Sequence, residues 1–99
     1  MREAVIVSTA RTPLTKSHRG EFNAISGAEL AALAVRAAVD RSGVDAHTIE
    51  DVVLGCGYPE GRLGRNVARA SVVRAGLPLS IAGATVSRFC ASGLQAIAM

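Results

Sequence analysis

The feature that most restricts the fold of this chain is a short β-prone run joined to a helix by a cysteine-containing connection, within residues 84–99. Residues 84–87, ATVS, favour a strand because Thr and Val are β-branched. The segment ASGLQAIAM, directly after Cys90, favours a helix. Strands that lead into helices are typical of α/β proteins, in which helices cover a mostly parallel sheet. The sequence therefore predicts an α/β fold with Cys90 between a strand and a helix.

Two further apolar runs have the length and composition of buried strands. Residues 4–7 read AVIV, and residues 51–57 read DVVLGCG. Continuous apolar runs of this kind are typical of parallel strands that are covered on both faces. Together with residues 84–87 they predict three strands, each followed by a helix, in the order β-α-β-α-β-α.

The two helices between these strands have recognisable ends. Ser26 and Glu29 have the spacing of a capping box, and Gly43 can adopt the left-handed conformation that ends a helix. Asn66 is a suitable N-cap for a second helix over residues 67–75. The first helix carries apolar residues around most of its circumference, so we expect it to be largely buried against the sheet.

The charge of the chain gives limited information about partners. The net charge is +3, and the only local concentration of positive charge is a set of arginines: Arg62, Arg65, Arg69, Arg74 and Arg88. Nucleic-acid binding is not expected, because interleaved aromatic residues and known motifs are missing. A solvated or subunit-facing surface is the preferred interpretation, with contact to the phosphates of a small molecule as the alternative. No apolar run has the length needed to cross a bilayer, so no membrane partner is expected.

The two cysteines call for different interpretations. They do not form a disulfide framework, and we expect a reducing, cytoplasmic compartment. Cys56 lies between two glycines without neighbouring metal ligands, so we expect a packed, unreactive thiol and no metal site. Cys90 precedes a helix, whose N-terminal partial positive charge favours a thiolate. It is therefore a candidate nucleophile, and the alternative is an unreactive core cysteine. His18 and His47 are expected to be solvated.

Four segments of the chain resemble landmarks of the thiolase family. They are residues 6–13 (IVSTARTP), 53–57 (VLGCG), 64–78 (GRNVARASVVRAGLP) and 85–97 (TVSRFCASGLQAI), and the last closely resembles the family's active-site cysteine signature. They occur in thiolase order and spacing over nearly all 99 residues. Many thiolases have Asn in place of Ser87, Leu or Val in place of Phe89, and Gly in place of Ala91. These departures leave the acyl-chain preference open.

The resemblance implies a thiolase-like fold, with this chain as the first part of the N-terminal α/β/α layered domain. It also implies acyl transfer to or from coenzyme A, of the acetyl-CoA acetyltransferase or 3-ketoacyl-CoA thiolase type used in fatty acid metabolism. Cys90 would become acylated, and its backbone N–H would belong to an oxyanion hole. Acyl-CoA and CoA would be substrates, without a tightly bound cofactor. The resemblance further implies a homodimer or homotetramer.

The family's catalytic His and second Cys lie in the C-terminal half of its chains, and neither His18 nor His47 has a matching motif. The CoA-binding residues are also expected outside this sequence. We therefore expect residues 1–99 to be a truncated N-terminal part that is inactive alone. Two alternatives stay open: a ketoacyl synthase-type condensing enzyme, and a non-catalytic thiolase-like protein that acts in binding or assembly. The sequence does not separate biosynthetic from degradative thiolases.

Overall fold

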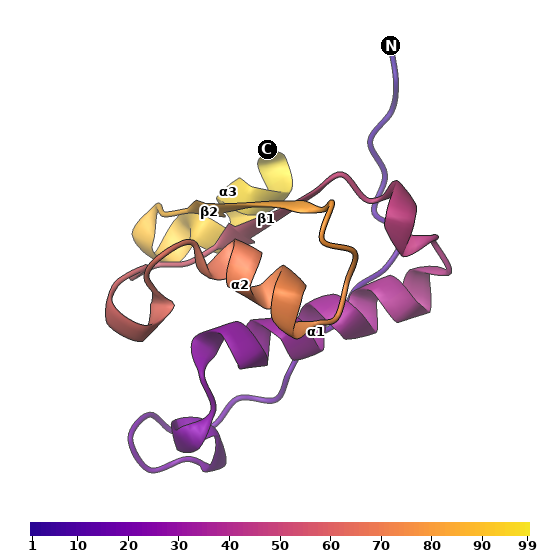
Figure 1. Cartoon of the computed structure of the whole chain (residues 1–99). Helices are drawn as coiled ribbons and strands as arrows, with labels where there is room; N and C mark the ends of the chain where they lie inside the picture. The colour runs from indigo at the N-terminus through magenta and orange to yellow at the C-terminus, as the bar shows by residue number, and fades with distance from the viewer.

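A computed structural model of the chain describes residues 1–99. Two strands and three helices alternate along the chain, and Figure 1 shows their arrangement. In chain order these elements are α1 (Gly27–Ser42), β1 (Asp51–Gly55), α2 (Val67–Arg74), β2 (Ala82–Val86) and α3 (Ser92–Ala98), with short 3-10 turns η1 (Glu21–Ala24), η2 (Ala46–Thr48), η3 (Gly61–Leu63) and η4 (Phe89–Ala91). None of the helices combines the length and apolarity that crossing a bilayer requires.

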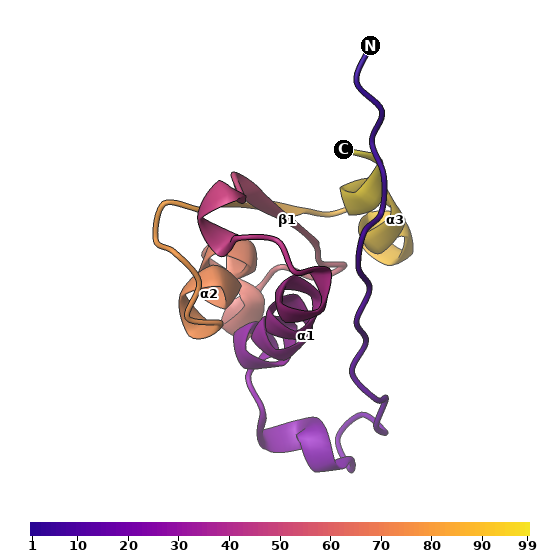
Figure 2. The ribbon, with the colours of Figure 1, turned by 90° about the vertical axis from the view of Figure 1, so that its right-hand side faces the viewer.

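The two strands are parallel and divide the molecule into three layers. Asp51 lies opposite Ala82, and the register continues to Gly55 opposite Val86. Because side chains alternate along a strand, one face of the sheet is turned toward α1 and α2 and the other toward α3. The two views in Figures 1 and 2 show α3 on the opposite side of the strands from the other two helices. The predicted α/β/α layering is therefore confirmed.

The core lies between the sheet and the α1–α2 pair, and it is small. Val72, Leu77 and Ile81 form its centre, with Val35 and Val52 among the side chains packed around them. Only eight of the 99 residues are buried. The core thus depends mainly on α2 and on the segment that leads from it into β2.

The prediction that the first helix is largely buried is wrong. Ala32 is the only buried residue of α1, and the Leu33 side chain is 56% exposed. The physical reason is the width of the sheet: two strands and one neighbouring helix cover only one side of a helix that has apolar residues around most of its surface.

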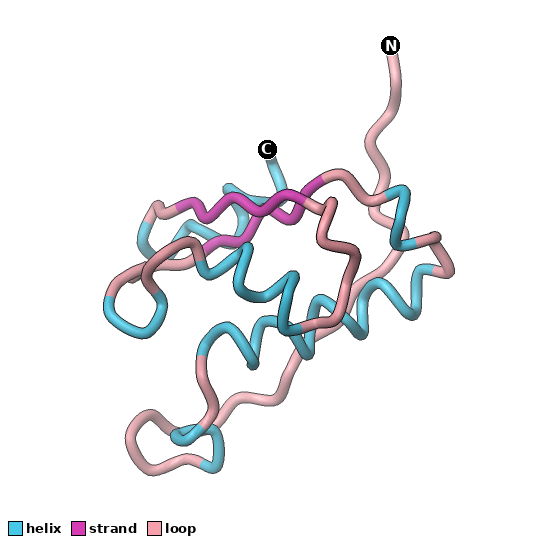
Figure 3. The backbone as a smooth tube through the Cα atoms, viewed as in Figure 1, coloured by secondary structure: helices cyan, strands magenta, loops and turns pink.

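The strand predicted over residues 4–7 is also absent. The segment is drawn as loop in Figure 3, and none of the backbone hydrogen bonds involves it. Val5 and Ile6 are about three-quarters exposed, at 73% and 74%. A β-prone run becomes a strand only when a neighbouring strand pairs with it, and β1 and β2 pair only with each other. The observed order is therefore α-β-α-β-α. The last strand also begins two residues earlier than predicted, at Ala82.

The predicted helix ends are confirmed. The Ser26 hydroxyl accepts a hydrogen bond from the Glu29 N–H at 3.2 Å, which is the serine half of the capping box. Gly43 ends α1 in the left-handed conformation, with φ of 68°. Asn66 caps α2, and its side-chain oxygen accepts from the Arg69 N–H at 3.4 Å. Both helices are thus bounded by local sequence signals.

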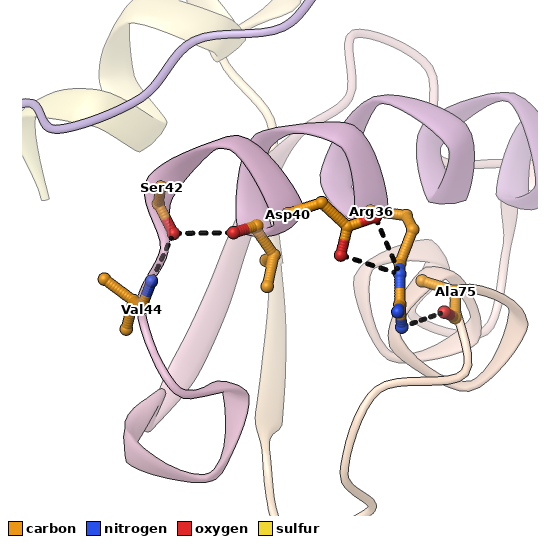
Figure 4. Close-up of polar contacts among 6 residues, drawn as sticks. Arg36, Asp40, Ser42, Val44 and Ala75 are labelled. Carbon is orange, nitrogen blue, oxygen red and sulfur yellow. Dashed lines mark hydrogen bonds and ion pairs between the residues drawn. The ribbon is translucent and has the colours of Figure 1, made fainter.

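A polar contact joins α1 to the end of α2. The Arg36 guanidinium pairs with Asp40 one turn further along α1, at 3.1 Å, and donates to the Ala75 carbonyl at 3.4 Å (Figure 4). In the same view, the Ser42 hydroxyl donates to the Val39 carbonyl and accepts from the Val44 N–H, which closes the last turn of α1. The exposed ion pair contributes little stability by itself, but the bond to Ala75 fixes the two helices side by side.

Candidate active site

Cys90 lies in the connection between β2 and α3, which we call the elbow (residues 87–92). Its side chain is exposed, and the residue is the middle one of η4, two positions before α3 begins. The elbow follows the carboxyl end of β2, at the edge of the sheet where parallel α/β proteins generally bind their ligands. Within residues 1–99 the thiol of Cys90 is therefore exposed and does not belong to the core, and its role as a nucleophile stays a prediction.

The hydrogen bonds of the elbow backbone do not use the N–H of Cys90. The N–H of Ala91 donates to the Arg88 carbonyl at 3.0 Å, and the N–H of Ser92 donates to the Phe89 carbonyl. Neither bond uses the N–H of Cys90, because first-turn donors have no partner within the turn. This N–H is attached to the same residue as the thiol, so it can stabilise negative charge on an oxygen of a group that the sulfur attacks.

Phe89 has an unusual backbone conformation. Its φ is 48°, in the left-handed region that bulky residues rarely adopt. Such a conformation persists only where surrounding contacts fix it, and it is found mainly at functional sites. Here it turns the chain sharply between β2 and η4, and the turn brings Cys90 to the surface.

The elbow rests on the residues that leave β1. A Cβ atom at Gly55 would lie 2.6 Å from the Gly93 nitrogen and closer still to the Ser92 carbonyl group. A Cβ at Gly57 would meet the Phe89 carbonyl oxygen at 3.2 Å. Glycine at these two positions therefore lets the start of α3 and the elbow approach the β1 backbone directly. This close approach fixes the position of Cys90 relative to the sheet.

Two aromatic side chains lie beside the elbow. The ring of Tyr58, from the loop after β1, is 5.9 Å from the ring of Phe89 between centroids, at an angle of 59°. Both side chains are exposed. The pair forms an exposed apolar surface on the elbow, at the residue before Cys90.

The contacts of Arg69 fit neither interpretation given above for the arginines, a solvated or subunit-facing surface or a contact to phosphates. Its guanidinium donates to the carbonyls of Leu79 (at 3.0 Å) and Ile81, and its side chain is partly buried. It therefore stabilises the connection between α2 and β2, and is neither a solvated charge nor a free phosphate ligand. Arg74, one turn further along α2, is exposed as predicted.

Neither histidine of the chain lies near Cys90. His47 is in η2, just before β1, whereas Cys90 follows the far end of the parallel β2. A five-residue strand spans about 16 Å, so the length of the sheet separates them. His18 is in the loop that precedes η1, which both Figure 1 and Figure 2 place away from α3. These 99 residues therefore place no imidazole where it could take a proton from Cys90.

Cys56 occupies a different environment. It is half-buried and lines an apolar hollow with Leu30, Leu54 and Val67, on the side of the sheet that carries α1 and α2. This agrees with the expectation of a packed thiol. No cluster of three His, Cys, Asp or Glu residues is placed to hold a metal ion.

Sequence reasoning missed the contributions of Ser92 and Gly55. Nothing in the sequence assigned a specific contact to Ser92, whose side chain is buried and hydrogen-bonded within the elbow. Gly55 is in contact with a segment 37 positions later, which no local pattern reports. The available signal was the pair of glycines around Cys56, since a glycine at a strand end often marks a close approach of another backbone.

The sequence of the chain matches a known family. Residues 4–99 match the sequence profile described as "Thiolase, N-terminal domain". The chain is 43% identical over 98 residues to a 3-ketoacyl-CoA thiolase of Bacillus subtilis (strain 168), a match that covers 99% of this chain and 25% of the relative.

Two other relatives match over nearly the same range. A 3-oxoadipyl-CoA/3-oxo-5,6-dehydrosuberyl-CoA thiolase of Escherichia coli (strain K12) is 42% identical over 98 residues, which cover 98% of this chain and 24% of that protein. An acetyl-CoA acetyltransferase of Syntrophomonas wolfei is 36% identical over 98 residues, with 99% and 24% covered. The chain thus spans about a quarter of the length of the curated relatives it matches.

Proposed function

This chain belongs to the thiolase family, and from that premise we propose that Cys90 is the nucleophile of a thiolase-type acyltransferase that moves acyl groups to and from coenzyme A. The observation that carries the proposal is the placement of Cys90: an exposed thiol in a fixed turn at the carboxyl end of β2, with its own N–H unused by that turn. The relatives named above are thiolases and an acetyl-CoA acetyltransferase, which supports CoA thioesters as the substrates.

The proposed reaction has two steps. In the first, the Cys90 thiol gives up its proton to a base and Sγ attacks the carbonyl carbon of an acyl-CoA. An S–C bond forms, the bond from that carbon to the CoA sulfur breaks, and CoA leaves and takes up a proton. In the second step the acyl carbon bonds to the sulfur of a second CoA or to the α-carbon of an acyl-CoA, which gives up a proton to a base. The Sγ–C bond breaks, and Cys90 takes up a proton. A thiolate both attacks and leaves well, so covalent catalysis divides one difficult transfer into two easier ones.

The elbow would assist both steps through its backbone. Negative charge develops on the carbonyl oxygen as Sγ attacks, and the N–H of Cys90, which the bonds of the turn do not use, would donate to that oxygen. A preorganised donor of this kind is typically worth about 3–4 kcal/mol of transition-state stabilisation. Neither His18 nor His47 lies where it could act as this base, so we expect residues 1–99 alone to be inactive.

Acetylation of Cys90 tests the proposal. The full-length protein is incubated with acetyl-CoA in the absence of a second acceptor, and its peptides are analysed by mass spectrometry. We expect one acetyl group on Cys90, none in a Cys90→Ala variant, and full acetylation in Cys56→Ala, the control for the other thiol. Acetyl-CoA should also protect Cys90 from iodoacetamide. Acetylation elsewhere, or no protection, contradicts the proposal, and acetylation only from acyl-carrier protein indicates a ketoacyl synthase-type enzyme.

We further propose a homodimer or homotetramer without a tightly bound cofactor, in the cytoplasm and acting in fatty acid metabolism. The family membership supports the first two points, and two unbridged cysteines agree with a reducing compartment. Light scattering of the purified full-length protein tests the assembly, and cell fractionation tests the location. Thiolysis assays with a series of 3-ketoacyl-CoA chain lengths identify the preferred substrate.

A further inference from the structure

The side chain of Ser92 is almost completely enclosed, with 3% of its surface exposed. Its hydroxyl accepts a hydrogen bond from the Arg88 N–H at 2.8 Å and donates one to the Phe89 carbonyl at 2.7 Å. These two groups lie on either side of the Arg88–Phe89 junction, immediately before Cys90. One oxygen atom therefore closes a ring of five residues that contains the candidate nucleophile.

The hydrogen-bonded ring closed by Ser92 contains a residue with an unfavourable backbone conformation, Phe89. With φ of 48°, Phe89 is held in a backbone region that its side chain disfavours. The carbonyl of Phe89 accepts from both the N–H and the hydroxyl of Ser92, so two bonds from one residue restrain it. The third bond restrains the N–H of Arg88 on the other side of the strained residue. Together they fix the backbone that determines where Cys90 points.

Few other side chains can do this. The position needs one atom that both donates and accepts, on a residue that is almost completely buried. Alanine would leave the Arg88 N–H unpaired in a part-buried site. Threonine retains the hydroxyl and adds only one methyl group.

We propose that Ser92 is a positioning residue, which holds the elbow so that the sulfur and the N–H of Cys90 face the same acyl group. Ser92 does not touch the substrate and acts only through the backbone on either side of Phe89. This inference rests on the proposed function, since it assigns Ser92 a part in acylation of Cys90.

The test compares Ser92→Ala and Ser92→Thr with Ser71→Ala in the full-length protein. Ser71 is the matched control because its hydroxyl is also buried and also donates to a backbone carbonyl, that of Val67, but within α2. The first readout is hydrogen–deuterium exchange of the Arg88 amide, resolved by fragmentation, which requires no catalytic activity. The second is the rate at which acetyl-CoA acetylates Cys90, and the third is the rate of alkylation by iodoacetamide, a small reagent that needs no oriented complex.

Ser92→Ala should speed exchange of the Arg88 amide and slow acetylation by about 100-fold, the usual effect of a misplaced reacting group. Its alkylation rate should stay within a few-fold of wild type. Ser92→Thr should restore most of the acetylation rate, and Ser71→Ala should change none of the three readouts. Unchanged Arg88 exchange in Ser92→Ala overturns the proposal, and so does faster exchange with unchanged acetylation.

The failure of the proposed function is recognisable separately. If the wild-type protein is not acetylated at Cys90, the catalytic role of both residues falls. The exchange of the Arg88 amide still reports on the bond that Ser92 makes. If the Ser92→Ala protein does not fold, amide exchange is faster throughout the chain and not only at Arg88. The test then depends on Ser92→Thr. If that variant folds and its Arg88 amide is protected, but Cys90 is acetylated slowly, the proposed role of the hydroxyl is contradicted.

Discussion

At the scale of single residues, Gly55 determines how closely α3 approaches the sheet. The place where its side chain would lie is filled by the backbone at the start of α3. Backbone atoms cannot move aside as a flexible side chain can, so a larger residue at this position has to displace the helix, and the elbow moves with it.

Gly55→Ala should lower the free energy of unfolding by about 1–3 kcal/mol, through overpacking against Ser92 and Gly93. Urea unfolding of the full-length protein measures this. Gly93→Ala is the matched control, since a Cβ there meets nothing within 4 Å and alanine suits a helix better than glycine. It should unfold at the same or a higher urea concentration. Equal stability of the two variants would contradict the close packing of α3 on β1.

At the scale of elements, the start of α2 is tied to β2 by a small polar network. The Asn66 amide donates to the Gly83 carbonyl at 2.8 Å, and its oxygen accepts from the Thr85 hydroxyl at 2.8 Å. The Thr85 oxygen in turn accepts from the Ala68 N–H at 3.1 Å. Asn66 itself has φ of 63°, a conformation that asparagine tolerates better than most residues. This cap therefore links a helix to a strand, whereas Ser26 serves only its own helix.

Asn66→Ala should cost about 2 kcal/mol of stability, because it removes the cap and places alanine in a left-handed conformation. Ser26→Ala, which removes a single local cap bond, should cost about 1 kcal/mol. Thermal and urea unfolding of both variants give the comparison. If the two substitutions have equal effects, neither the bonds from Asn66 to β2 nor its left-handed conformation adds to the contribution of a simple cap.

The connection from α2 to β2 depends on Arg69. Lysine at this position retains the positive charge, but it lacks the planar guanidinium whose two NH groups donate to the carbonyls of Leu79 and Ile81. Arg69→Lys should therefore lower the stability by about 1–2 kcal/mol, whereas Arg74→Lys, on the exposed side of α2, should change it by less than about 0.5 kcal/mol. CoA affinity, measured by calorimetry, should be unchanged in both. A loss of CoA affinity without a loss of stability would show that Arg69 contacts the phosphates.

Elements with local signals were predictable from the sequence, and elements that need distant partners were not. The cap of α1 at Ser26 and its end at Gly43 depend on residues within one turn, and both predictions are confirmed. The run at residues 4–7 has the composition of a strand, but pairing decides whether it becomes one. The candidate site divides in the same way. Cys90 could be identified from its neighbours in the sequence. The contact of Gly55 with the start of α3 could not, because it joins segments that are distant in the sequence.

At the scale of the whole molecule, the apolar surface is large relative to the core. Leu94 and Ile97 of α3 are 73% and 71% exposed, while the buried core is centred on three residues. Exposed apolar surface favours association of the protein with other molecules and binding of apolar dyes. A small core buries little surface on folding, so we expect the unfolding transition to be broad.

The isolated 99-residue polypeptide should therefore bind the dye ANS and unfold over a broad range of urea. The double substitution Leu94→Ser and Ile97→Ser should reduce dye binding while changing stability by less than about 0.5 kcal/mol, because both side chains are already in water. Ile81→Ala, in the centre of the core, should instead cost about 2–5 kcal/mol. Sharp unfolding without dye binding would contradict the small core seen here.

The contact between Gly55 and Ser92 also has a consequence for the timing of synthesis. Those residues are 37 positions apart, so a ribosome has to add the whole of α2 and β2 after β1 before the elbow can meet its support. Cys90 itself is added after β2, and its turn stays unsupported until Ser92 and the start of α3 have also been added and have reached Gly55. A synthetic peptide of residues 84–99 would stay in that condition permanently, because the partner that shapes its turn is encoded elsewhere in the message.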